Sequence, residues 1–155
     1  MSLLDFFRPA PPHEDPHLGS LLYSGGRWRG SIELEQGKRV PAFLPGGRSG
    51  PAPQALQLAQ NAAESWTRVR SDVASELFEH YNNGRDGGAP ELPDLALPSD
   101  VWSHVTLSSV EIGPHRSLDE FQVAIRTAWD DEHTLGALIR DGVLVGLNGS
   151  ILEPR

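Results

Sequence analysis

The chain has 155 residues, of which 13 are Lys or Arg and 21 are Asp or Glu, so its formal net charge is −8 at pH 7. This length is typical of one domain, and the acidic balance argues against nucleic acid as a partner, because affinity for phosphate depends mostly on Lys and Arg. Cysteine is absent, which excludes disulfide bonds, thiolate metal sites and cysteine nucleophiles.

The sequence lacks a secretory signal and any run of the roughly 18 apolar residues that a membrane helix needs. We therefore expect a soluble, cytoplasmic protein with no membrane partner. Residues 1–17 are predicted to form an N-terminal arm and residues 18–152 a single domain. The prolines among residues 9–17 favour extended chain, so the match of His13 to His17 to the metalloprotease pattern H-E-x-x-H fails, because that pattern needs a helix.

The first part of the domain has the alternating pattern of β-strands. Trp28, Ile32 and Leu34 share one face of a strand that begins at Arg27, and charged residues share the other. We predict strands at Leu18 to Ser24, from Arg27 onward, and at Lys38 to Leu44. Glycine-containing turns separate them.

From residue 53 the apolar period changes from two to about 3.6. The apolar stripe consists of Ala55, Ala59, Ala62, Trp66, Val69, Val73, Leu77 and Tyr81. Pro53 suits the first turn and Asn82-Asn83-Gly84 suits a C-terminal cap, so we predict one helix of about thirty residues. A long loop at residues 82–98 follows, and loops of this length commonly carry function.

The C-terminal part is predicted to begin with one helical turn at residues 99–102. A strand at Val105 to Ile112 follows, and a shift in its apolar parity predicts a bulge. Further strands are expected at Asp119 to Trp129, Leu135 to Arg140 and Val143 to Leu147, the last two joined by the type I′ turn Asp141-Gly142. The predicted fold is α+β: an antiparallel meander sheet of about six to seven strands with one long helix packed on one face.

A cluster of polar residues lies where the strand ending at Trp129 turns into the next. It consists of Trp129, Asp130, Asp131, Glu132 and His133. Carboxylates and an imidazole are ligands for a hard metal ion, and crowding can separate their pKa values for acid and base catalysis. Consecutive strand residues point to opposite faces, however, so three interpretations stay open: a structural turn, a partner-binding surface, and a catalytic or metal site.

The segment Trp129 to Gly136, followed by residues 141–146, resembles a group of small bacterial domains of unknown function. That group has a W-D-x-E-H-G-L-G segment, a terminal β-meander, an early W-x-G motif and a helix that ends in a Tyr-Asn-like run. In this chain the W-x-G motif is Trp28-Arg29-Gly30 and the Tyr-Asn-like run is Tyr81-Asn82. Thr134 stands where the group has glycine. The resemblance spans about residues 18–149 and implies no activity. The resemblance also implies a similarity to some immunity proteins, which neutralise toxins of bacterial competition systems.

The negative charge is concentrated late in the chain. Residues 91–155 contain 11 acidic and 4 basic residues, a net charge of −7, whereas residues 1–90 contain 10 acidic and 9 basic residues, a net charge of −1. An acidic patch speeds the capture of a basic partner. We therefore predict a non-enzymatic, immunity-type domain that binds a protein partner, such as a basic toxin, at Trp129 to His133, without cofactor or metal. The alternative is a metal-dependent hydrolase that uses Asp130 to His133.

Overall fold

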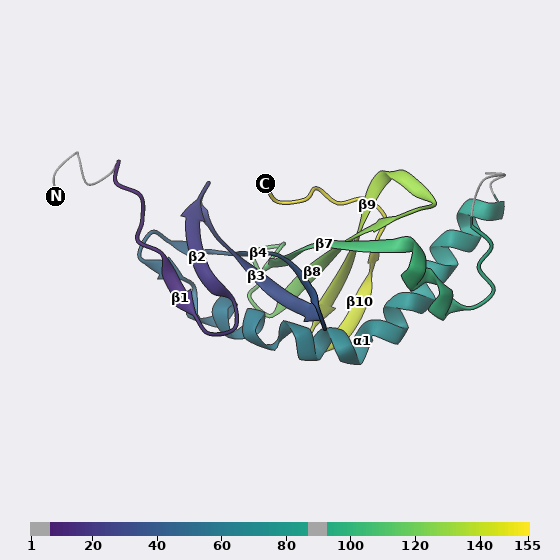
Figure 1. Cartoon of the computed structure of the whole chain (residues 1–155), viewed down its shortest axis with the longest axis horizontal. Coiled ribbons are helices and arrows are strands. Elements are labelled where there is room, and N and C mark those ends of the chain that lie inside the picture. Colours follow the sequence, from purple (N-terminus) through teal and green to yellow (C-terminus); the bar gives the residue numbers. More distant parts are fainter. Residues whose placement is uncertain (1–6, 87–92) are drawn as a thin grey trace.

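A computed structural model describes residues 7–86 and 93–155. Eight of the strands in these residues form one sheet (Figure 1). The order across the sheet is β1-β2-β3-β4-β7-β8-β9-β10. The strands are β1 (His13–Asp15), β2 (Gly19–Ser24), β3 (Arg27–Glu35), β4 (Lys38–Leu44), β7 (Val105–Ile112), β8 (Glu120–Thr127), β9 (Asp130–Arg140) and β10 (Val143–Asn148). With one long helix, α1 (Pro53–Asp86), the fold is α+β, which confirms the predicted class.

The pair β4 and β7 is parallel, whereas every other neighbouring pair in this sheet is antiparallel. Between the two strands the chain forms a small hairpin of β5 (Gly46–Gly47) and β6 (Gly50–Pro51), then α1, then the 3₁₀ helix η2 (Pro98–His104). A long helix returns the chain across the sheet, so the next strand can run parallel to β4. The meander expected from the sequence is therefore interrupted once.

Part of the predicted arm is a strand, because β1 pairs with β2. The carboxylate of Asp15 fastens this segment to the domain. Its Oδ1 accepts hydrogen bonds from the backbone N–H groups of His17 and Leu18 at 2.8 and 2.9 Å, and Gln60 Nε2 of α1 donates to its Oδ2 at 2.7 Å. These contacts order a segment whose prolines alone predict only extended chain.

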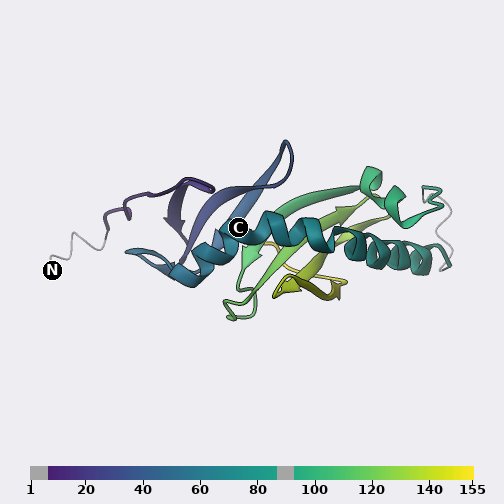
Figure 2. The same cartoon turned by 90° about the horizontal axis from the view of Figure 1, so that it is seen from below.

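Helix α1 crosses one face of the sheet along almost its whole width (Figure 2). Its predicted apolar stripe is buried, with each member no more than 2% exposed: Ala55, Ala59, Ala62, Trp66, Val69, Val73, Leu77 and Tyr81. The predicted cap at Asn82-Asn83-Gly84 is wrong, because these residues are helical and Gly84 has no positive φ. Of the predicted loop at 82–98, residues 87–92 lie outside the described part of the chain.

Several local predictions are confirmed. The turn between β9 and β10 has φ values of 52° at Asp141 and 71° at Gly142, as a type I′ turn requires. The β7–β8 register shifts between Leu107 and Ser109, which is the expected bulge, and η2 contains the expected helical turn. In the described ranges 7–86 and 93–155, no helix is both long and apolar enough to cross a membrane.

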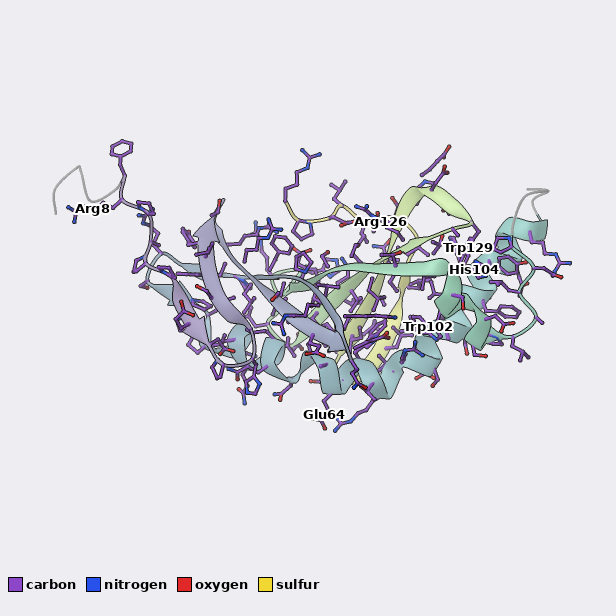
Figure 3. All side chains as sticks on the ribbon, in the orientation of Figure 1. Arg8, Glu64, Trp102, His104, Arg126 and Trp129 are labelled. Atoms are coloured by element: carbon purple, nitrogen blue, oxygen red, sulfur yellow. The ribbon has the colours of Figure 1, made fainter. Side chains whose placement is uncertain are left out.

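The sheet face opposite α1 is here called the open face. The C-terminal tail, residues 149–155, crosses part of it (Figure 1). Ile151 N donates to Thr134 O at 2.9 Å, and Glu153 pairs with Arg126 at 2.9 Å; Arg126 is labelled beneath the tail in Figure 3. Thr134 Oγ1 also donates to Glu153 at 3.2 Å. Thr134 does not have a positive φ, so replacing the expected glycine causes no backbone strain.

Candidate functional site

Trp129 anchors the turn between β8 and β9 to the C-terminal part of α1 (Figure 3). Its Nε1 donates a hydrogen bond to His80 Nδ1 at 3.0 Å, and its ring packs edge-on against Tyr81 with centroids 5.6 Å apart. The side chain is only half-buried. It therefore holds the turn in place with one hydrogen bond and ring contacts to both His80 and Tyr81.

Asp130 shapes the turn through its carboxylate. Oδ1 accepts hydrogen bonds from the backbone N–H groups of Glu132 and His133 at 3.2 Å, and His133 Nδ1 lies 3.0 Å from both oxygens. His80 Nε2 lies 3.9 Å from Oδ2. Because His80 Nδ1 accepts from Trp129, the neutral imidazole carries its proton on Nε2, which faces the carboxylate. Asp130 thus lies between two histidines.

The predicted cluster divides into two groups. Trp129, Asp130 and His133 are held by contacts within the turn and with α1, whereas Asp131 and Glu132 are exposed. Within the described part of the chain, neither of these two side chains has an ion pair, and no group of three or more His, Asp and Glu side chains is arranged to hold a metal ion. The geometry therefore gives the hydrolase interpretation no support.

Two carboxylates of α1 are close to His80 in the sequence. Glu76 is one helical turn before His80, Glu79 directly precedes it, and both are exposed. Figure 1 shows the β8–β9 turn and the last turns of α1 at the same end of the molecule. Glu76, Glu79, Asp131 and Glu132 together are called the acidic end. Among the residues the structure describes, none of the four forms an ion pair with Lys or Arg.

His80 is the residue of this site that the sequence analysis missed. It lies near the end of the predicted helix, where a histidine is expected to favour the helix dipole. Its contact with Trp129 joins residues that are 49 positions apart. Periodicity reports only on local structure, so no signal in the pattern connected them.

No curated protein and no solved structure matches the chain. One family does match, over residues 17–150, and its description is "Domain of unknown function (DUF6985)". This match agrees with the resemblance to domains of unknown function that the sequence motifs indicate. Because it covers most of the chain, this protein belongs to that family.

Proposed function

We propose that this protein is a non-enzymatic, cytoplasmic binding domain of the immunity type, which captures a basic protein such as a bacterial toxin through its acidic end. One observation carries the proposal: Glu76, Glu79, Asp131 and Glu132 are exposed and have no cationic partner among the described residues. Some other surface carboxylates have a cationic partner, as in Arg27–Glu111, Arg68–Glu64 and Arg126–Glu153, whereas the exposed Glu14, Asp72 and Asp141 have none among the described residues.

Unpaired carboxylates that share one end of a molecule repel one another and create a negative potential. A basic partner removes that repulsion, and the potential raises the rate at which the two proteins meet. The hydrogen bond between Trp129 and His80 fixes the turn that carries Asp131 and Glu132. A turn that is already fixed loses less conformational entropy on binding, which favours affinity.

The test compares two double variants that each remove two negative charges. Asp131→Asn with Glu132→Gln changes the acidic end, and Glu14→Gln with Glu33→Gln is the matched control in β1 and β3. Wild-type protein is used to capture partners from the native host at low and high salt, and the purified partner is then used for association kinetics. We expect the first variant to associate about tenfold more slowly at low salt and to depend less on salt, whereas the control matches the wild type.

Growth measurements test the immunity role separately. Co-expression of the captured partner should stop growth unless wild-type protein is present, and the acidic-end variant should protect less well than the control. Failure of wild-type protein to recover a partner at either salt concentration contradicts the proposal. Equal association rates for the two double variants contradict it as well.

A further inference from the structure

The two edges of the sheet differ in how well they are protected against pairing with another chain. Among the described residues, β1 forms one edge and β10 forms the other. Strand β1 has only three residues, two of them acidic, and it lies between Pro12 and Pro16. Short length, charged side chains and proline are the features by which proteins keep an edge strand from pairing. The edge at β1 is therefore protected.

The edge at β10 lacks these features. Its six residues include neither a proline nor a charged side chain. Val143 is 63% exposed and Val145 is 52% exposed, so apolar side chains border this edge. Figure 2 shows β10, in yellow, at one margin of the molecule and to the side of α1. An edge of this kind presents unpaired backbone N–H and C=O groups that only another strand satisfies in full.

The register of β9 and β10 identifies the first of these backbone groups. In a two-residue hairpin, the residues that flank the turn form a hydrogen-bonded pair, and here they are Arg140 and Val143. Hydrogen-bonded and non-hydrogen-bonded pairs alternate along an antiparallel ladder. The next pair is Leu144 opposite Ile139. The N–H and C=O of Leu144 therefore point away from β9, towards the free edge.

The bulge in β10 does not interrupt this edge. The extra residue is Val145, because the register shifts between Leu144 and Gly146. Leu147 lies opposite Ala137, which is two positions before the residue that faces Leu144. Leu147 therefore points its N–H and C=O outward as well, and the two outward residues keep the spacing of a regular strand.

We propose that β10 pairs with β10 of a second copy of this chain, antiparallel and about a two-fold axis, so that two sheets join into one. This goes beyond the capture of a basic protein. The two-fold register places Leu144 opposite Leu147 of the second copy and the reverse, so each outward N–H meets a C=O. It also brings Val145 against Gly146 of the second copy, where a Cβ atom meets nothing within 4 Å.

Charge favours a second copy over the basic protein proposed for the acidic end. Strand β10 has no carboxylate to attract a cation. It also has no charge to repel its own copy, although each chain has a net charge of −8. In the two-fold register Asp141, the carboxylate nearest the strand in sequence, faces Ser150 of the second copy. Pairing therefore places no like charges directly opposite each other.

Sedimentation equilibrium of the full chain between about 10 μM and about 1 mM tests the proposal. We expect a dissociation constant on the order of 100 μM, because one pair of strands makes a small interface. Val145→Lys should weaken the dimer at least about tenfold, because the two-fold axis brings the two ammonium groups together. Leu22→Lys is the control, since Leu22 is 55% exposed on β2, away from this edge, and it should leave the dimer unchanged.

Hydrogen exchange of the wild-type protein identifies the paired strand without any substitution. The N–H groups of Leu144 and Leu147 should exchange about fivefold more slowly at about 1 mM than at about 10 μM, because about four-fifths of the chains are then dimeric. Those of Val143 and Asn148 face β9 and should change little. Absence of a dimer at about 1 mM, a dimer without slower exchange at Leu144 and Leu147, or equal weakening by the two lysine variants would overturn the proposal.

Discussion

The charged residue that most strongly joins the sheet to the helix is Glu35, at the end of β3. Its Oε1 accepts hydrogen bonds from Trp66 Nε1 at 3.0 Å and Arg70 Nε at 2.6 Å, and Lys38 Nζ donates to Oε2 at 3.1 Å. Arg70 also lies 4.0 Å above the ring of Trp102. Burial raises the pKa of Glu35, but these hydrogen bonds outweigh it and lower the pKa to about 2.

Glu35→Gln should lower the free energy of unfolding at pH 7 by about 2 kcal/mol, because it removes charged hydrogen bonds to partly buried donors. The folded-state pKa of about 2 lies below the ordinary value of 4.5, so the stabilisation is present above pH 4.5 and is lost as the pH falls towards 2. Urea unfolding at pH 7 and at pH 3 measures this. The exposed and loosely paired Glu33 provides the control, Glu33→Gln. If the Glu35→Gln and wild-type proteins lose stability equally on acidification, the interpretation is wrong.

The contacts of Glu35 and His80 could not be predicted from the sequence. Trp66 and Arg70 lie 31 and 35 positions after Glu35, and Trp129 lies 49 positions after His80. A hydrophobic pattern shows which face of an element is buried but not which polar group of another element meets it. The cluster at Trp129 to His133 could be recognised because its members are adjacent in the sequence. Which of its side chains are held by contacts and which are exposed depends on residues of α1 that are distant in the sequence, so the pattern did not show this division.

Among the elements, α1 shows where sequence patterns are sufficient and where they are not. The apolar stripe predicted the start and the buried face of α1. The cap predicted at Asn82-Asn83-Gly84, however, placed the end of the helix too early. Tyr81 donates a hydrogen bond to Pro93 O and packs against Trp129, so tertiary contacts hold the last turns in helical form. The parallel pair of β4 and β7 had no sequence signal either, because the alternation of a strand does not encode its direction.

Gly84→Ala tests the corrected end of α1. Gly84 is helical and exposed, and a Cβ atom there meets nothing within 4 Å. Alanine is the better helix former, so the substitution should raise the free energy of unfolding by about 0.5 kcal/mol. Gly37 has a φ of +74°, so Gly37→Ala should instead be destabilising by about 1 kcal/mol. Chemical denaturation measures both variants, and destabilisation by Gly84→Ala would show that this glycine caps the helix.

At the scale of the whole molecule, the acidic end combines the β8–β9 turn with the last turns of α1, which the hydrogen bond from Trp129 to His80 joins. The last turn of α1 also contains the exposed Arg85, which forms no ion pair with the four carboxylates. The negative potential of this end is therefore that of four carboxylates reduced by one cation.

The concentration of unpaired carboxylates at one end should make folding stability depend on salt even when no partner is present. With a net charge of −8, self-repulsion opposes the compact state, and salt screens it over a Debye length of about 10 Å at roughly 0.1 M. We expect the melting temperature of the wild-type protein to rise by about 2–4 °C between low and high NaCl concentrations. Asp131→Asn with Glu132→Gln should melt higher than the wild type at low salt and gain less from added NaCl.

The matched control separates local repulsion from net charge. Glu14→Gln with Glu33→Gln removes the same number of charges, but Glu14 accepts a hydrogen bond from Ser20 and Glu33 accepts one from Gly37 N. This variant should melt lower than the wild type, because carboxylates with partners stabilise the fold. Thermal unfolding of the three proteins over a series of NaCl concentrations measures the difference. If the two double variants respond alike, the four carboxylates do not form a repulsive cluster, and the acidic end loses its physical basis as a capture surface.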